Sequence, residues 1–427
     1  MFNAASVAPN LTDIFRSTRH IAWQAGLRVS CADRIITFLH WTFMMNRTRA
    51  ASTAINGALI VATLGFAIPA SAQSSVTLYG IVDNGFVYTH NSGGKSTQVG
   101  LISGSLSGSR WGLKGVEPLG GGLSAIFQLE NGVNLNTGKM NQGGRLFGRQ
   151  SYVGLKSATA GTLTMGRIYD PLTDLVQPAQ GDNYLGQTFT SPGDVDNADS
   201  SARFNNALKW ASPRWFGLSG EMMYGFGGVA GSVVSGQTYS AALNYGQGGF
   251  TLAGGYLHMD RGNATLSTRG TASSDTLFNS SVNAAYASAK AIDVWRVATQ
   301  YAFSAFTVGA YYSDSRYSAD GASSFSRTEI YRNTSAFAVW KVTPSWLAEA
   351  AYNFLKSSGD SAARYHQVSV GADYLLSKRT DIYTIVSYAH ASGQNGAGDA
   401  QAVIGATDID AGKASQTRVN VGLRHRF

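Results

Sequence analysis

The chain has 427 residues, of which 44% are hydrophobic and only 14% are charged, and its formal net charge is +8. The charged share lies well below the roughly 25% of soluble domains. No run of residues reaches the ~20 apolar positions that a transmembrane helix needs. The composition therefore argues against both an ordinary soluble domain and a helical membrane protein.

The first distinct element is a leader. Its longest apolar stretch, residues 54–68, follows Arg47 and Arg49 and precedes Pro69-Ala-Ser-Ala72. A basic start, a short apolar run and an A-x-A end are typical of a secretory signal peptide. We therefore expect a signal peptide over residues 44–72, with cleavage after Ala72.

Residues 1–43 have no place in such a signal. We interpret them as translated sequence upstream of the true start, with an extended leader as the alternative. The predicted mature chain, residues 73–427, keeps 27 basic and 23 acidic residues, a net charge of +4, which weakens a nucleic-acid-binding interpretation. The single cysteine, Cys31, precedes the signal, so we expect no disulfide in the mature chain.

Apolar and polar residues alternate in segments of about 9–11 residues, the length of a tilted membrane strand. The connections between the segments are alternately short and long, and the long ones include 169–202, 260–290 and 391–414. This pattern predicts an all-β fold, a transmembrane antiparallel β-barrel of about 16 strands. The predicted strands begin near residues 75, 107, 121, 146, 160, 203, 215, 237, 249, 291, 305, 327, 345, 364, 379 and 415.

The connection 169–202 is a candidate functional element. No Lys or Arg occurs between Arg167 and Arg203, but six aspartates do, and a loop this long is usually functional or disordered. Sixteen strands enclose a wide water-filled channel, so we expect the loop to fold inward and narrow it. The alternative is a solvated outer loop. The acidic candidates on the loop are Asp170, Asp174 and Asp182.

Basic residues stand at the starts of the strands that flank this loop. Arg110, Arg149 and Arg203 open predicted strands two, four and six. Arginine keeps its charge and can bind several partners even where water is scarce. Opposed charges across a narrow gap would create a transverse field, which low-dielectric walls focus. We therefore predict a basic wall facing the acidic loop.

The last strand ends the chain on Phe427. Val419, Val421 and Leu423 alternate with polar residues, which places an apolar face toward lipid. The polar face carries three more bases, which we expect to be lumen or rim charges away from the constriction: Arg418, Arg424 and Arg426.

These features together resemble the general-diffusion porins of the Gram-negative outer membrane, of the kind common in β-proteobacteria. The resemblance covers essentially all of 73–427. The motifs that carry it are Gln73-Ser-Ser-Val-Thr-Leu-Tyr-Gly80, Ser109-Arg-Trp-Gly-Leu-Lys-Gly-Val-Glu117, Gly148-Arg-Gln-Ser-Tyr-Val-Gly-Leu-Lys156, Gly161-Thr-Leu-Thr-Met-Gly-Arg167, Asp373-Tyr-Leu-Leu-Ser-Lys-Arg-Thr-Asp-Ile-Tyr383 and Val421-Gly-Leu-Arg-His-Arg-Phe427.

The resemblance implies a homotrimer of sixteen-stranded barrels in the outer membrane, among lipid and lipopolysaccharide, that lets small hydrophilic solutes and ions diffuse passively. It implies a constriction loop after strand five and an arginine wall, matched by Arg110, Arg149 and Arg203, with Lys114 where related porins often carry another base. It also implies that Phe427 is the signal read by the outer-membrane assembly machinery. No cofactor, metal or nucleic acid is expected.

One motif departs from the family pattern. The loop tip reads Pro178-Ala-Gln-Gly-Asp182, with Ala179 where many such porins carry an acid. Three arginines facing fewer close acids favour a mild preference for anions.

Three rival functions remain. An enzyme would need a placed nucleophile and base, and no histidine of 73–427 lies in such a motif. A non-conducting adhesin or structural barrel would fill its lumen, as barrels of about eight strands do. A substrate-specific channel is the nearest alternative, with Tyr169, Tyr184 and Phe189 as a candidate aromatic track.

Overall fold

A computed structural model describes residues 74–266 and 277–427. The predicted upstream segment, 1–43, and the predicted signal peptide, 44–72, lie outside the described residues. The described residues form one compact unit. No helix in the described part of the chain is long and apolar enough to cross a membrane.

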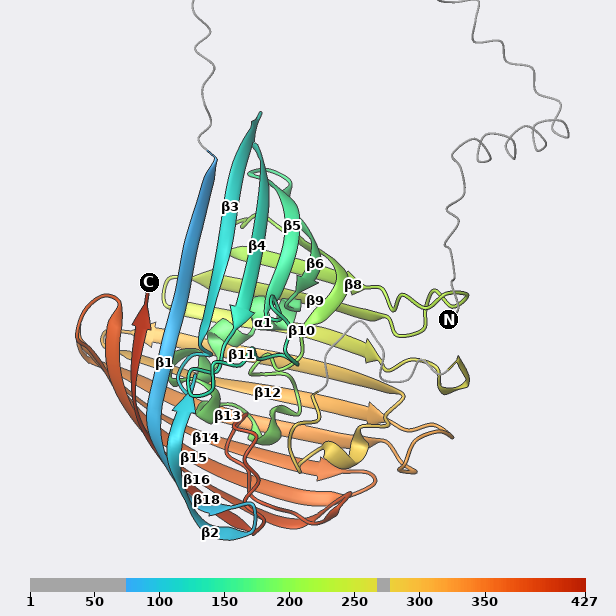
Figure 1. Ribbon diagram of the computed structural model, residues 1–427, viewed down its shortest axis with the longest axis vertical. Helices are drawn as coiled ribbons and strands as arrows, with labels where there is room; N and C mark the ends of the chain where they lie inside the picture. The colour runs from blue at the N-terminus through green and yellow to red at the C-terminus, as the bar shows by residue number, and fades with distance from the viewer. Residues whose placement is uncertain (1–73, 267–276) are drawn as a thin grey trace, which may run out of the picture. The chain divides into compact units, whose positions relative to one another are not determined.

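Antiparallel strands make up most of the described chain (Figure 1). The strands of the first half are β1 (Ser75–Ser92), β2 (Lys95–Ser103), β3 (Arg110–Gly120), β4 (Leu123–Gly132), β5 (Gln150–Ser157), β6 (Gly161–Ile168), β7 (Phe204–Ala211), β8 (Leu218–Gly225) and β9 (Thr238–Gln247). Those of the second half are β10 (Phe250–Asp260), β11 (Ala291–Phe303), β12 (Phe306–Ser318), β13 (Glu329–Thr343), β14 (Trp346–Ser358), β15 (Ala362–Leu375), β16 (Thr380–Asn395), β17 (Gly398–Asp399) and β18 (Ser415–Arg426).

These strands close into a barrel because β18 pairs with β1, from Ile81 opposite Arg426 to His90 opposite Thr417. The described strands fill sixteen positions around the wall. β2 and β3 share the second position, since both pair with β1, and β17 only extends the β16 strand end. The predicted sixteen-stranded barrel is confirmed, and each predicted strand start falls within four residues of an observed one. The sequence interpretation missed β2 and the break after it.

Alternation gives the wall an apolar outer face and a polar inner face. On β14, Trp346 and Tyr352 are exposed while Glu349 and Asn353, one residue out of phase, are buried. Aromatic rings gather at the end of the barrel that carries the short turns. Phe306 stacks on Trp340 with their centroids 5.8 Å apart, and Trp346 lies 4.8 Å from Tyr374. Such a girdle marks the interface between hydrocarbon and water.

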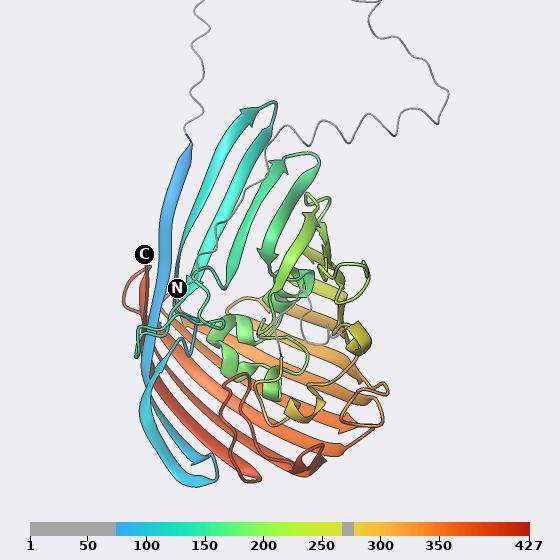
Figure 2. The same ribbon diagram turned by 45° about the vertical axis from the view of Figure 1, so that its right-hand side comes forward.

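The connection 169–203, which we call the inward loop, folds inside the barrel (Figure 2). It holds two short helices, α1 (Pro171–Leu175) and α2 (Asp182–Leu185), and three 3₁₀ turns, η3 (Gln177–Ala179), η4 (Gln187–Phe189) and η5 (Pro192–Asp194). Two further 3₁₀ turns lie outside the inward loop, η6 (Ala264–Leu266) and η7 (Ala284–Tyr286).

Hydrogen bonds attach the inward loop to the wall opposite β3–β5. Ser369 Oγ donates to Thr188 O over 2.6 Å, and Gln367 Nε2 donates to the same carbonyl over 2.8 Å. Ser313 Oγ donates to Asp196 Oδ2 over 2.5 Å. Apolar residues of the loop pack against this wall as well; one buried cluster joins Leu185 and Phe189 of the loop to wall residues such as Phe337, Val339 and Ile385.

Candidate functional site

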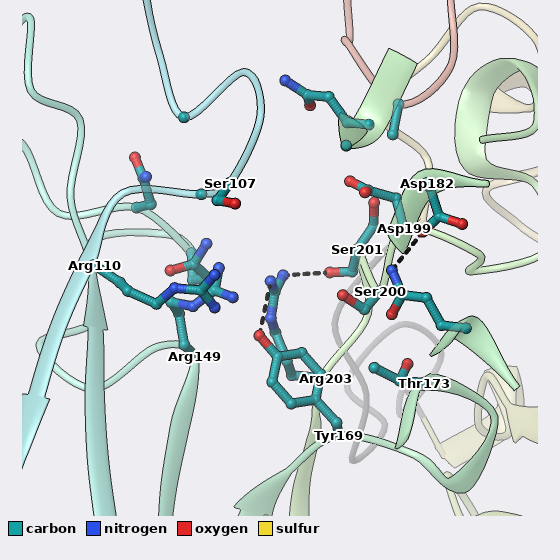
Figure 3. Close-up of a pocket in the computed structure, with 18 of the residues that line it drawn as sticks. Ser107, Arg110, Arg149, Tyr169, Thr173, Asp182, Asp199, Ser200, Ser201 and Arg203 are labelled. Carbon is teal, nitrogen blue, oxygen red and sulfur yellow. Dashed lines mark hydrogen bonds between the residues drawn. The ribbon is translucent and has the colours of Figure 1, made fainter. Parts of the chain in front are cut away.

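A cavity of about 980 Å³ lies in the lumen between the inward loop and the wall formed by β3–β5. Figure 3 shows Arg110 and Arg149 on one side of it, Asp182 and Asp199 on the other, and Arg203 between them. The sequence interpretation named four of these five residues. The fold brings them together from the start of β3, from the residue just before β5 and from the inward loop, which ends just before β7.

The basic side is built around one buried acid. Glu130 on β4 accepts a hydrogen bond from Arg149 Nε over 2.7 Å, and its Oε1 lies 3.9 Å from Arg110 Nη1. Tyr79 OH donates to the other oxygen of Glu130 over 2.9 Å. One carboxylate therefore holds two of the three arginines in place and offsets part of their charge.

Arg203 completes the basic side from the end of the inward loop. Its guanidinium carbon lies 5.2 Å from the centroid of the Tyr169 ring, and that of Arg149 lies 5.9 Å from the same ring. Arg203 Nη1 also donates to Ser201 O over 3.0 Å. A cation over an aromatic face is attracted by the ring quadrupole, so Tyr169 positions two arginines without cancelling their charge.

Two basic residues stand where the sequence interpretation did not put them. Lys114 does not line the cavity; it lies further along β3, with its Nζ 5.2 Å from the centroid of the Tyr79 ring. Arg424, which was expected to lie away from the constriction, lines the cavity. Its Nη1 donates to Ser107 Oγ over 2.7 Å, and its Nε donates to Asp381 over 3.0 Å. Closure of the barrel through the β1–β18 pair carries Arg424 to this side.

The remaining C-terminal bases do not line the cavity. Arg418 is 1% exposed, and its Nε donates to Asn420 Oδ1 over 3.0 Å. Arg426 Nη1 donates to Asp381 Oδ2 over 2.7 Å.

The acids of the inward loop fall into three groups. Asp174 lines the cavity, but it pairs with Lys209 of β7, whose Nζ also lies 3.6 Å from Glu221. Lys209 thus carries one positive charge between two carboxylates. Lys209 therefore offsets only part of the negative charge of Asp174.

Asp182 and Asp199 face the cavity without a basic partner in the described chain. Asp182 is 6% exposed and accepts a hydrogen bond from Gln177 Nε2 over 2.7 Å. Burial raises the pKa of Asp182 to about 7. Burial and the nearby Asp194 and Asp182 charges raise the pKa of Asp199 well above its usual value. These carboxyl groups therefore carry less than full negative charge near neutral pH.

Asp170 lies on the inward loop, as predicted, but does not line the cavity. It is fully buried and caps α1, with Oδ1 accepting from Leu172 N over 2.9 Å. Its Oδ2 accepts from Thr173 Oγ1 and Asn197 Nδ2. An acid at this position satisfies the free N–H groups of the helix start.

The break between β2 and β3 also shapes the cavity. Residues 104–109 leave the wall and turn into the lumen, where the buried Asp83 of β1 accepts hydrogen bonds from Leu106 N and Ser107 N over 2.8 and 2.6 Å. Tyr383 OH donates to the same carboxylate over 2.6 Å. Alternation alone cannot reveal such a break, because it depends on an acid in another strand.

Of the three aromatic residues of the candidate track, Tyr169 and Tyr184 line the cavity, but Phe189 does not. Phe189 is fully buried against Leu185 and Phe337, and Tyr184 donates to Gln300 Oε1 over 2.8 Å. Phe427 lies at the strand end, where its N–H and C=O pair with Gly80 over 3.0 and 3.1 Å, and the residue is 44% exposed.

Comparisons with known proteins agree with this architecture. Residues 58–394 match the family described as Gram-negative porin. The major outer membrane protein P.IB of Neisseria meningitidis serogroup B is 30% identical over 379 residues, 86% of this chain and 99% of that protein. An outer membrane porin protein of Bordetella pertussis is 36% identical over 184 residues, 38% of this chain, and the match spans just under half (45%) of that protein.

Solved structures share the fold. An anion-selective porin from Comamonas acidovorans superposes with a TM-score of 0.66 at 23% identity, over 83% of this chain and all of that one. The trimer form of OmpT from Vibrio cholerae superposes with a TM-score of 0.59 at 15% identity, over 83% of this chain and 99% of that one. The chain belongs to the Gram-negative porin family and is an outer-membrane channel rather than an enzyme.

Proposed function

We propose that the cavity is the constriction of a passive channel for small hydrophilic solutes and ions, and that this constriction favours anions. The observation that carries the proposal is the imbalance of free charge. Arg110, Arg149 and Arg203 line one cavity, whereas the loop acids are capped, paired or raised in pKa.

The acids of the inward loop contribute less negative charge to the cavity than their number suggests, and the reason differs from one acid to the next. Asp170 is buried as a helix cap. Asp174 is paired with Lys209. Asp182 and Asp199 have raised pKa values because they are buried. Among the described residues, Glu130 is the acid that forms ion pairs with the arginines of the basic side, and one carboxylate cannot neutralise two guanidinium groups. A passing anion therefore meets net positive charge.

The test is the reversal potential of single channels in a planar bilayer under a KCl gradient. Arg110→Gln, Arg149→Gln and Arg203→Gln should each lower the anion-to-cation permeability ratio, because each removes one charge from the cavity. Arg379→Gln in the short turn between β15 and β16 removes the same charge far from the cavity and should leave the ratio unchanged. Cation preference in the unmodified channel would contradict the proposal.

Assembly is a separate part of the proposal. Resemblance to porins supports a homotrimer, and the solved OmpT is described as a trimer. Native electrophoresis before and after heating tests this, since a trimer should give way to a faster band. We further propose that Phe427, at the exposed end of the last strand, is the signal for the outer-membrane assembly machinery.

A further inference from the structure

Three cations occupy one row on the outside of the barrel. Arg332 on β13 lies opposite Lys356 on β14, and Lys356 lies opposite Arg364 on β15. All three are exposed. Their neighbours in sequence, such as Asn333 and Tyr365, are buried inside, so the three side chains face outward. We call Arg332, Lys356 and Arg364 the basic row.

The basic row is largely unbalanced in the described chain. Arg332 Nε donates to Asp314 Oδ2 over 2.9 Å, but Asp314 also pairs with Arg316, whose Nε lies 2.7 Å from Oδ1. Lys356 and Arg364 form no ion pair or hydrogen bond with any described residue. Neighbouring strands lie about 4.8 Å apart, and like charges directly opposite one another destabilise a sheet. An anion between them would remove this repulsion.

The height of the basic row corresponds to the level of lipid headgroups. Below Lys356, the outward residues of β14 are Phe354, Tyr352, Ala350, Ala348 and Trp346. Lys356 is ten positions along the strand from Trp346, and a rise of about 3.4 Å per residue with a tilt of 35–45° gives roughly 24–28 Å of barrel height. The apolar band of such barrels is about 25 Å tall. The girdle and the basic row therefore bound the hydrocarbon at opposite ends.

The end of the barrel follows from the connections. The row lies beside the connection 319–328, at the end of the barrel that also carries the long connections 169–203 and 400–414 and opposite the short turns and Phe427. Outer-membrane barrels place the longer loops outside the cell and the short turns in the periplasm. The row thus meets the outer leaflet. Figure 1 shows β13, β14 and β15 side by side in this part of the wall.

We propose that the basic row binds the phosphate groups of a phosphorylated glycolipid of the outer leaflet, the lipid A part of lipopolysaccharide. Arginine binds phosphate through two parallel hydrogen bonds, and lysine binds it as a point charge. Two phosphates on one headgroup match a row of three cations better than a single phosphate does. The acyl chains would lie along the apolar stripe beneath, where Tyr352 OH is hydrogen-bonded to His366 over 2.7 Å.

The test compares folded full-length barrels in detergent by native mass spectrometry with added lipid A. The triple variant Arg332→Gln, Lys356→Gln, Arg364→Gln removes the row. Each basic side chain near an anionic surface contributes about a fivefold change in affinity, so the three together should weaken lipid A binding by about 100-fold. The control triple variant Lys341→Gln, Lys378→Gln, Arg379→Gln removes the same charge from the opposite end and should bind lipid A as the unmodified protein does.

Two more lipids separate headgroup recognition from general adhesion. Lipid A without its phosphates should bind the unmodified barrel as weakly as intact lipid A binds the row variant. Phosphatidylglycerol, with one phosphate, should bind less tightly than lipid A. Equal binding of intact lipid A to the row variant and the control variant would overturn the proposal, as would equal binding of the two lipid A forms. Unchanged conductance and heat-modifiable mobility establish that the variants are folded, independently of ion selectivity.

Discussion

Glutamate 130 gives the sharpest test of how the cavity sets selectivity. Glu130→Gln keeps the shape of the side chain and removes one negative charge. Its Oε1 is 2.7 Å from Arg149 Nε and 3.9 Å from Arg110 Nη1. The substitution therefore leaves both arginines in the cavity but without their counter-charge. We expect the channel to become more selective for anions.

The magnitude follows from the distances. An anion on the far side of the Arg149 guanidinium lies about 7 Å from the Glu130 carboxylate. At a dielectric constant of ~80, the repulsion between these two negative charges is about 0.6 kcal/mol. Removing that charge raises the local anion concentration about threefold and lowers the cation concentration by the same factor, so the permeability ratio should rise roughly sevenfold.

The assay is the reversal potential in a planar bilayer under a KCl gradient with about 0.1 M salt on the concentrated side, where the Debye length is about 10 Å. Glu117→Gln is the matched control, because Glu117 is exposed further along β3 and does not line the cavity. The reasoning is refuted if the Glu130→Gln channel has the same reversal potential as the Glu117→Gln control, or if its reversal potential indicates a greater preference for cations.

Three further outcomes are expected. The pKa of Asp182 is about 7, so its carboxyl is neutral below that pH and negative above it. The anion preference should therefore fall between pH 6 and pH 8, and Asp182→Asn should reduce this change in reversal-potential measurements. Replacing Gln367 and Ser369 by alanine removes hydrogen bonds to the inward loop worth about 1 kcal/mol each and should increase open-channel current noise. Phe427→Ala should lower the yield of heat-modifiable barrel in outer-membrane fractions while the assembled pores conduct normally.

The barrel was predictable because alternation is a local property. A strand such as β14 shows its two faces in its own residues, from Trp346 to Phe354, and the short and long connections give the order of the strands. The same logic predicted that Arg110, Arg149 and Arg203 lie together, since each stands at the start of a strand that flanks the inward loop, β3, β5 or β7. The phase of each arginine along its strand and its height in the barrel were enough to predict that the three lie together.

Residues that depend on pairing between strands were not found this way. The position of Glu130 beside Arg110 could have been predicted from the sequence, because the β3–β4 hairpin pairs Gly112 with Glu130. Arg110, two residues before Gly112, is then the diagonal neighbour of Glu130. The pairing of Arg424 with Asp83 could not have been predicted in this way, because the two residues meet only when the first and last strands close the barrel. The break after β2 depends on Asp83 and Tyr383, which are 300 residues apart.

The acids show why a count of charges alone cannot give the selectivity of the constriction. Six aspartates against three arginines suggest a negative constriction, yet each aspartate's effect depends on its surroundings. Asp170 and Asp194 accept backbone N–H bonds, and Asp196 accepts Ser313 Oγ. These three hold the loop in its inward path rather than facing solutes. The loop therefore uses half of its acids to keep its own shape, and we expect the arginines that it faces to determine the sign of the field.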